Sequence, residues 1–161
     1  MKIIAINGSH RGKKGNTHKL IEKLFEGASQ KGAFCEEILL SEHKINPCID
    51  CKICNSEKSM FKCVYDDKDD VKMIFDKIRE ADLVIIATPV YLFTISGKLK
   101  IFLDRINSTA DSNSFLLNNN GLFFHHIDEK LCSKKYVFII TCDNFMNETV
   151  KNSISYFKTY N

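Results

Sequence analysis

Four of the seven cysteines of this 161-residue chain lie close together, with a spacing suited to holding a metal group. Cys48, Cys51, Cys54 and Cys63 follow the pattern C-x2-C-x2-C-x8-C. Three thiolates at two-residue gaps can bind successive corners of a cubane, and a more distant fourth thiolate completes a 4Fe-4S site. Zinc fits this order less well, because its usual pattern has two C-x2-C pairs separated by a longer loop. A redox-active disulfide, and cysteines that hold no metal, remain open alternatives.

A second polar group follows the apolar run 2–7, in the stretch GSHRGKKGNT from Gly8 to Thr17. A helical pattern opens at its end, and the first N–H groups of a helix and its dipole attract anions. The side chains that would converge on one phosphate are Ser9, Arg11, Asn16 and Thr17. Glycines at 8, 12 and 15 let the backbone approach and turn. We therefore predict that this loop binds the phosphate of a mononucleotide.

This loop differs from the two best-known phosphate loops. A Walker loop requires G-x-x-x-x-G-K-[ST], whereas Lys14 is followed here by Gly15, so the magnesium ligand is missing. The dinucleotide fingerprint G-x-G-x-x-G is absent as well. A solvated basic turn is the alternative interpretation. The position of the loop between a first strand and an amphipathic helix favours the phosphate site.

A third stretch, PVYLFTISGKLKIFLDR, follows the most strand-like run of the chain at 82–88. Helical spacing of apolar residues begins at Gly97, so we expect residues 89–96 to form a loop at the carboxyl end of a central strand. Ligands of open α/β sheets bind at that edge. The third stretch is therefore a second candidate for a ligand-binding loop.

Alternating strands and helices are expected to position these stretches. Strands are predicted at 2–7, 34–40, 82–88 and 135–141, and helices at 17–30, from 71, from 97 and at 148–160. Glu36 and Glu37 place the second strand near the sheet edge. Asn16 is the expected N-cap of the first helix, and the acidic run 66–70 is interpreted as a cap and solvated face of the second. Such alternation predicts a parallel sheet covered on both faces.

Two parts of the chain are less informative. Ser, Asn and Asp dominate 107–120, and the apolar and histidine residues at 122–126 fit either a short helix or a lid. The other three cysteines are expected to be small core side chains, because they stand beside apolar strand residues; they are Cys35, Cys132 and Cys142.

Composition indicates one globular domain. The hydrophobic fraction is 44% and the charged fraction 27%, as in soluble proteins. The net charge of +3 is small and the basic residues are spread along the chain, so we expect no nucleic-acid partner. No signal peptide or bilayer-spanning apolar run is recognised, so we expect a cytoplasmic protein with no membrane partner. Clustered cysteines indicate metal or redox chemistry rather than a secreted disulfide framework.

Together the three stretches resemble the iron-sulfur flavoprotein and NADPH-dependent FMN reductase branch of the flavodoxin-like proteins. The loops match G-S-x-R-x-x-x-G-N-T and P-V-Y-x-x-x-x-S-G-x-L-K-x-F-x-D-R. The likeness runs from Met1 to about Arg105, and more loosely through the strand at 135–141. It implies one flavodoxin-like FMN-binding domain over residues 1–161, an α/β doubly wound parallel sheet in three α/β/α layers, with a cysteine-rich cluster loop at 46–64. The sheet is expected either to lack the usual fifth strand or to be completed by a partner or an atypical segment.

The resemblance also implies the cofactors FMN and a 4Fe-4S cluster, and the residues that hold them. Ser9, Arg11, Gly15, Asn16 and Thr17 would bind the FMN phosphate. Pro89, Val90, Tyr91, Leu92 and Phe93 would run beside the ribityl chain and ring, with Ser96 and Gly97 shaping the turn into the next helix. Thr141, Cys142 and Asp143 correspond in position to a third flavin loop. Cys48, Cys51, Cys54 and Cys63 would ligate the cluster, and no side chain is assigned a catalytic role.

The chemistry of the second loop suits a flavin independently of the resemblance. A flavin needs an apolar or aromatic surface for its ring and backbone donors near N5 and the N1/C2 end. A loop with a proline, a tyrosine and a phenylalanine offers both. In the alternative interpretation, Tyr91 and Phe93 merely pack the rim of the sheet.

The resemblance implies an FMN-dependent oxidoreductase. It would pass electrons from a ferredoxin-like low-potential donor through the cluster and FMN to a small-molecule acceptor. A homodimer or homotetramer is expected, because relatives place subunit contacts in the segment 107–134. One alternative is an NAD(P)H-dependent FMN or quinone reductase without a cluster. An alternative of another class is a flavin-free, zinc-braced redox-sensing or binding module on the same fold.

Overall fold

The computed structural model describes residues 1–56, 58–117, 123–144 and 146–159. Its main sheet has the strand order β2 (Phe34–Leu39), β1 (Lys2–Asn7), β3 (Leu83–Tyr91) and β7 (Lys135–Thr141), and all of these pair in parallel. A short strand, β4 (Thr94–Ile95), pairs antiparallel with the end of β3. The predicted parallel sheet is confirmed, with β2 at its edge and β3 between two partners.

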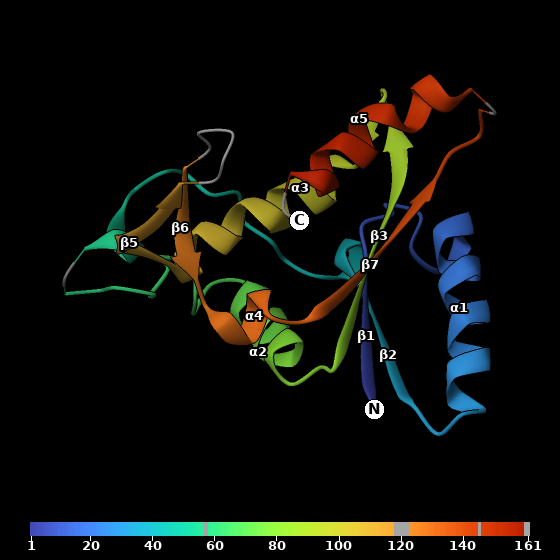
Figure 1. Ribbon diagram of the computed structural model, residues 1–161, viewed down its shortest axis with the longest axis horizontal. Helices are drawn as coiled ribbons and strands as arrows, with labels where there is room; N and C mark the ends of the chain where they lie inside the picture. The colour runs from blue at the N-terminus through green and yellow to red at the C-terminus, as the bar shows by residue number, and fades with distance from the viewer. Residues whose placement is uncertain (57, 118–122, 145, 160–161) are drawn as a thin grey trace.

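Helices cover both faces of this sheet unequally (Figure 1). In the described part of the chain, α1 (Asn16–Ser29) covers one face. The other face carries α2 (Val71–Arg79), α3 (Gly97–Asp104) and α5 (Asn147–Lys158), with the short α4 (Glu129–Cys132) beside α2. The result is the three-layer arrangement expected from the alternation of elements.

The sequence of β1 explains why it lies in the centre of the core. Ile4 and Ile6 pack on the face covered by α2, whereas Ile3 and Ala5 pack on the face covered by α1. All four are buried, since a parallel strand under helices on both sides has no solvent face. Burial of each isoleucine contributes about 1.5–3 kcal/mol relative to exposure.

A second, two-stranded sheet projects away from the main body (Figure 1). It consists of β5 (Ala110–Leu117) and β6 (Phe123–Ile127), paired antiparallel with an irregular register. Of the two interpretations of 122–126, a short helix or a lid, the short helix is wrong for the described part, 123–126, which is strand. Residues 118–122 lie outside the described residues. The polar composition of 107–120 concealed the hairpin, because strand pairing is made by backbone groups of any residue.

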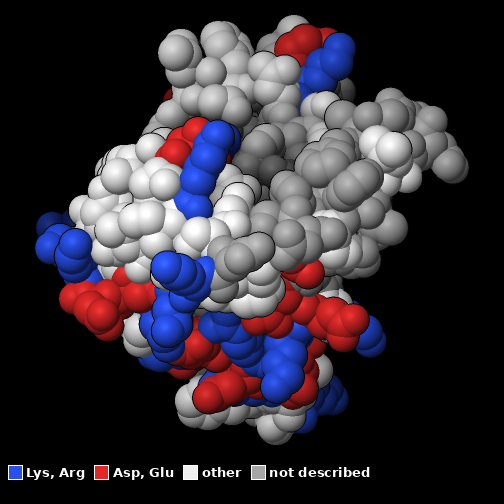
Figure 2. Space-filling model, turned by 90° about the vertical axis from the view of Figure 1, so that its left-hand side faces the viewer, with Lys and Arg blue, Asp and Glu red and all other residues white. Residues whose placement is uncertain are grey.

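Charge is mixed on the face of the molecule shown in Figure 2, where acidic and basic side chains intermingle over the lower part. This agrees with the basic residues being spread along the sequence. Among the described helices, none has both the length and the apolar character needed to cross a bilayer.

Candidate functional site

The carboxyl ends of β1, β3 and β7 bring three separate loops together. Thr17 Oγ1, at the end of the first loop, lies 2.8 Å from Thr141 Oγ1 at the end of β7. The His10 ring lies 6.0 Å, centroid to centroid, from the Tyr91 ring at the end of β3. Parallel strands end at one edge of a sheet, so residues more than a hundred positions apart become neighbours there. His10 belongs to the first loop, but the sequence did not predict its contact with Tyr91.

The first loop leads into α1 without a side-chain cap. Gly15 is the N-cap, so the expectation that Asn16 caps the helix is wrong: Asn16 is its first residue and is exposed. Glycine offers no oxygen to the first N–H groups of the helix, and the first turn contains no acidic residue. Those N–H groups and the positive end of the dipole are therefore suited to an external anion.

Ser9 and Gly15 form the floor of this loop. Ser9 is buried, and its Oγ accepts a hydrogen bond of 3.2 Å from Arg11 N. A Cβ atom added to Gly15 would lie only 2.9 Å from Ser9 Oγ, so this position requires glycine unless the serine moves. Gly12 adopts a φ of +51°, which favours glycine for a different reason.

Positive charge surrounds the same turn. Arg11, Lys13 and Lys14 are exposed, and none of them pairs with a carboxylate of the residues that the structure describes. Thr17, in contrast, is buried and directed at Thr141, so its hydroxyl already has one neighbour. The loop thus combines free cations with helix N–H groups, which is the electrostatic arrangement of an anion site.

The second loop is shorter than the sequence indicated. The interpretation of 89–96 as a loop is wrong at both ends, because β3 extends through Tyr91 and β4 begins at Thr94. Leu92 and Phe93 alone form the turn, both with positive φ, +46° and +64°. Two-residue hairpin turns with positive φ normally use glycine or asparagine, so bulky residues there are strained.

The strained turn is also apolar and exposed. Leu92 is 90% exposed and Phe93 56%, so Phe93 does not pack the rim of the sheet as the alternative interpretation supposed. Tyr91 is 40% exposed, whereas Pro89 and Val90 are half-buried. The hairpin therefore presents an apolar and aromatic surface beside the first loop.

Ser96 fastens the second loop to the first. Its Oγ donates a 2.7 Å hydrogen bond to Gly8 O and accepts one of 3.2 Å from Leu99 N, which caps α3. Its own N–H donates to Thr88 Oγ1 at 2.9 Å. Ser96 thus caps α3 and ties the hairpin to the first loop, and Gly97 is the exposed first residue of α3; the part of both residues in a flavin site stays a prediction.

The third loop follows β7. Cys142 and Asp143 are exposed, so the expectation that Cys142 belongs to the core is wrong. Cys35 is half-buried and packs against the cluster beneath α1, as expected for a core cysteine. The side chain of Cys132 lies outside the described part. The third loop meets the first through the Thr141 hydroxyl.

The four clustered cysteines are free thiols in one loop, Cys48 and Cys51 exposed, Cys54 and Cys63 half-buried. Burial raises the pKa of the Cys54 thiol, and negative charge on the three other thiols raises it further. Cys54 is thus within electrostatic range of each of the other three sulfurs. Among the described residues, no three histidine, cysteine or acidic side chains are grouped closely enough to hold a metal ion. The donors have the right chemistry for a thiolate-bound metal group, but they are not gathered around one point.

The backbone of this loop is unusual. Asp50 and Lys52, on either side of Cys51, have positive φ values of +49° and +58°, and Phe61 has +64°. Left-handed residues within a turn direct successive N–H groups into one concavity, as around phosphates and iron-sulfur groups. Non-glycine residues hold such angles at a cost, and they concentrate at functional sites.

A buried ion pair anchors the cysteine loop to the protein. Arg105, 1% exposed, donates from Nη1 to Asp69 Oδ2 at 2.5 Å and to Asn46 O at 3.0 Å. Its Nη2 donates to Cys63 Sγ at 3.1 Å, and its guanidinium lies 5.2 Å from the centre of the Tyr65 ring. Burial opposes the charge, yet the Asp69 carboxylate and the Cys63 sulfur keep the pKa of Arg105 above its usual value.

The interpretation of the acidic run 66–70 as a cap and solvated face is only partly right: Asp70 is the N-cap of α2 and Asp67 is exposed, but Asp69 is not solvated. The Asp69 side chain is fully buried, and Asp66 Oδ2 accepts a 2.9 Å bond from Cys63 N. Asp70 accepts from Lys44 N at 2.9 Å and from the His43 ring, and these bonds lower the pKa of its carboxyl. The run fastens the cysteine loop from both ends.

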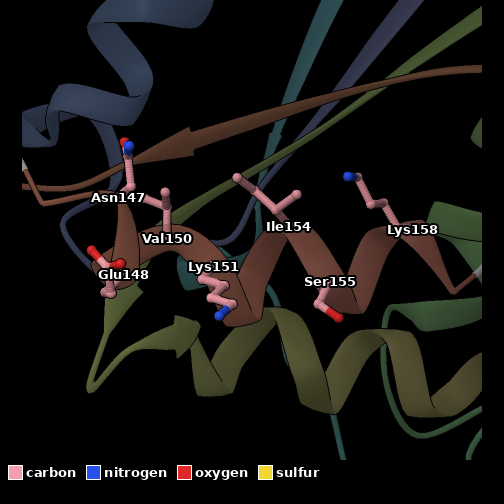
Figure 3. A pocket seen from close by; sticks show the side chains of 7 residues that line it. All are labelled: Asn147, Glu148, Val150, Lys151, Ile154, Ser155 and Lys158. Carbon is pink, nitrogen blue, oxygen red and sulfur yellow. The ribbon is translucent and has the colours of Figure 1, made fainter.

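A surface hollow along α5 contains none of these residues (Figure 3). It is lined by Asn147, Glu148, Val150, Lys151, Ile154, Ser155 and Lys158. Asn147, Val150 and Ile154 project from one side of the helix in Figure 3, and Lys151 from the opposite side. Because one helix supplies the whole lining among the described residues, the strand-end loops, where several elements meet, are the better candidate site.

Comparison with known proteins finds a matching family and several relatives. A family model described as NADPH-dependent FMN reductase matches residues 1–140. An iron-sulfur flavoprotein of Methanocaldococcus jannaschii is 39% identical over 105 residues, which cover 65% of this chain and 51% of that protein. A putative NAD(P)H-dependent FMN-containing oxidoreductase of Bacillus subtilis is 38% identical over 109 residues, covering 68% and 54%. The chain thus spans about half the length of these curated relatives.

The fold agrees with a solved structure. An FMN-dependent NADH-azoreductase from Bacillus anthracis, determined in complex with FMN, aligns with a TM-score of 0.64 at 17% identity. The alignment covers 99% of this chain and 80% of that one. At this identity the likeness establishes the flavodoxin-like α/β arrangement expected from the sequence.

Proposed function

The chain belongs to the NADPH-dependent FMN reductase family, and from that premise we propose that it is an FMN-dependent oxidoreductase that also holds a 4Fe-4S cluster. The FMN would lie where the three strand-end loops meet. The cluster would be held by the cysteine loop. The proposal follows the names of the curated relatives, several of which are called iron-sulfur flavoproteins.

The proposal that FMN binds here rests on the start of α1, which has no side-chain cap and follows a basic loop. The Gly15 N-cap leaves the helix N–H groups to an anion, and Gly15 also makes room for Ser9 Oγ. A flavin phosphate at this point would receive those N–H groups, the Ser9 hydroxyl and the Arg11 charge. A phosphate in this position would put the rest of the cofactor beside Tyr91, whose ring lies 6.0 Å from that of His10 in the same loop.

The second loop would then orient the flavin ring. Tyr91, Leu92 and Phe93 offer an exposed apolar surface that binding would cover. Because Ser96 ties this hairpin to Gly8, the phosphate site and the ring site would hold a fixed distance from each other. The proposed contacts to the phosphate also include Ser9, Asn16 and Thr17. Those to the ribityl chain and ring also include Pro89, Val90 and Gly97. The third loop would contribute Thr141, Cys142 and Asp143.

The proposed cluster is supported by four free thiols in one loop, with Cys54 in electrostatic range of the other three. Iron-sulfur groups require thiolate ligands, and the left-handed residues beside Cys51 supply the kind of backbone that surrounds such groups. A bound cluster exchanges one electron at a time and FMN can take two, so the pair would connect a one-electron donor to a two-electron acceptor. We propose a ferredoxin-like protein or NAD(P)H as donor, a small-molecule acceptor, and a homo-oligomer with contacts in 107–134.

A second candidate function is supported by the Bacillus subtilis relative, whose name refers to NAD(P)H and FMN and not to a cluster. In that case the cysteine loop would be structural and NAD(P)H would reduce the flavin directly. This candidate needs no metal ligands, and among the described residues the cysteines are not grouped closely enough to hold a metal ion.

The absorption spectrum of protein purified without oxygen separates these candidates. A brown protein that contains flavin, iron and acid-labile sulfide is the expected result. A yellow protein with flavin but no iron would leave the cluster-free reductase. A colourless, zinc-containing protein would contradict both and leave the zinc-braced module.

Replacement of Cys63 by alanine tests whether the fourth cysteine is a ligand. We expect Cys63→Ala to lose most of the iron and sulfide and to keep the flavin, because the flavin loops lie at the strand ends and not on the cysteine loop. Cys35→Ala is the matched control, since Cys35 is half-buried beneath α1. It should retain iron like the wild type. Equal iron in Cys63→Ala and Cys35→Ala would remove Cys63 from the ligand set.

A further inference from the structure

We propose that Glu37, in the edge strand β2, is a positioning residue for the first loop. Its carboxylate holds the start of α1 and the floor of that loop at a fixed separation, so the loop is already arranged when a phosphate arrives. The inference rests on the proposed phosphate site of FMN and deepens it. In the sequence, Glu37 indicated only that β2 lies near the sheet edge.

One oxygen of this carboxylate contacts the end of β1. Asn7, the last residue of β1, is fully buried and donates from Nδ2 to Glu37 Oε1 at 2.8 Å. Its Oδ1 accepts a 2.8 Å hydrogen bond from the backbone N–H of Ser9. Ser9 Oγ in turn accepts a hydrogen bond from Arg11 N. Two side chains thus connect β2 to the residues that we expect to contact the phosphate.

The other oxygen contacts the start of α1. His18 is the third residue of this helix, and its Nδ1 lies 2.5 Å from Glu37 Oε2. Because a carboxylate only accepts hydrogen bonds, Nδ1 is the donor. No side chain caps α1, so the position of its first turn depends on contacts such as this one and the contact of Thr17 with Thr141. One glutamate therefore bonds to both sides of the proposed phosphate site.

The surroundings of Glu37 differ from those of the glutamate before it. Neighbouring side chains of a strand point to opposite faces, and Glu36 pairs with Lys77 of α2, across the sheet from α1 (Figure 1). The Glu36 side chain is 29% exposed, whereas that of Glu37 is 13% exposed. Among the described residues, no lysine or arginine pairs with Glu37, whose partners are an amide and an imidazole. A carboxylate this buried is costly unless it is hydrogen-bonded, and these two directional donors hold it in one geometry.

The consequence concerns the phosphate and not the flavin ring. Without the carboxylate, the Asn7 amide loses one partner and the His18 ring loses its acceptor, so Ser9 and the first turn of α1 are no longer joined. Phosphate binding would then have to order these groups, which lowers the affinity. Riboflavin lacks the phosphate, so its affinity does not depend on that order. A purely structural role of Glu37 would instead reduce the folding stability and change the affinities for both flavins alike.

The test compares the affinities of apo-protein variants for FMN and for riboflavin, each followed by the quenching of flavin fluorescence. Glu37→Leu removes both hydrogen bonds. Glu37→Gln can keep them, because its amide oxygen accepts from Asn7 and its amide nitrogen donates to the other tautomer of His18. Glu36→Leu is the matched control, since it removes a partly buried glutamate of the same strand that has no contact with the first loop. Urea unfolding of each variant measures its folding stability.

We expect Glu37→Leu to bind FMN about tenfold more weakly than wild type, which corresponds to the cost of ordering one or two side chains on binding. Its riboflavin affinity should be unchanged. Glu37→Gln should recover most of the lost FMN affinity, and Glu36→Leu should bind both flavins like wild type. His18→Leu breaks only the bond to α1, so it should show a smaller loss for FMN alone. This variant provides the answer if Glu37→Leu fails to fold.

Three results would contradict the inference in different ways. A wild-type ratio of FMN to riboflavin affinity in folded Glu37→Leu or in folded His18→Leu would overturn it alone. Tighter FMN binding by both Glu37 variants would also overturn it, because the carboxylate would then act only as a charge that repels the phosphate. Wild-type protein that binds FMN no tighter than riboflavin would instead overturn the proposed phosphate site, and the role of Glu37 with it.

Discussion

Replacement of Gly15 by alanine is expected to weaken FMN binding by about 10- to 100-fold. The new Cβ would lie 2.9 Å from Ser9 Oγ and 3.3 Å from Arg11 Cβ, so it would displace both side chains from the first loop. Loss of one hydrogen bond to a charged group costs about 1.5–3 kcal/mol, which corresponds to this range of affinity. The measurement is an FMN titration of apo-protein, followed by the quenching of flavin fluorescence.

Gly27→Ala is the control for this prediction. Gly27 is an exposed residue inside the same helix, and an added Cβ would meet nothing within 4 Å. Alanine there should stabilise α1 by about 1 kcal/mol and leave FMN affinity unchanged. If Gly15→Ala bound FMN as tightly as Gly27→Ala, the phosphate would have to lie elsewhere.

The second large effect is a loss of folding stability, which we expect when the buried ion pair of Asp69 and Arg105 is broken. Asp69→Ala leaves the Arg105 guanidinium, 1% exposed, without its carboxylate. Removal of one partner from a buried pair typically costs about 3–5 kcal/mol, because an uncompensated charge stays in the interior. Urea unfolding of the apo-protein at neutral pH measures this loss. Because the measurement uses apo-protein, it reports the ion pair without a contribution from FMN or iron.

Asp104→Ala provides the matched comparison. Asp104 pairs with Lys100 on the surface of α3, where the two side chains are 41% and 47% exposed. Surface pairs contribute at most about 1 kcal/mol. If the free energies of unfolding of Asp69→Ala and Asp104→Ala proved equal, Asp69 would have no role in anchoring the cysteine loop.

The parallel sheet, its edge strand and its central strand could be predicted from the sequence, because parallel strands buried on both faces are apolar throughout. β1 and β3 show such runs, and the two glutamates of β2 correctly indicated an edge. The three loops could be placed together for the same reason, since parallel strands end at one side. These features depend on local composition and on general topology.

The contacts that were missed depend on residues far apart in the chain. Asp69 and Arg105 are 36 positions apart, and neither position looks buried in its local sequence. The hairpin at Leu92 and Phe93 lacks the glycine or asparagine that would predict a tight turn. Cys142 stands next to an apolar strand, but the strand ends one residue earlier and leaves it exposed. In each of these places the tertiary structure, and not the local sequence, determines the conformation or the burial of the residue.

The loop before α1 is proposed to bind the phosphate of FMN, and the rest of the proposed flavin site depends on this contact. The most direct test is a comparison of FMN with riboflavin, which has the same ring and ribityl chain but no phosphate, in titrations of the same apo-protein. At least two charge-assisted hydrogen bonds to the phosphate should make FMN about 100-fold tighter than riboflavin. Equal affinity for the two flavins, or uptake of neither, would contradict the account.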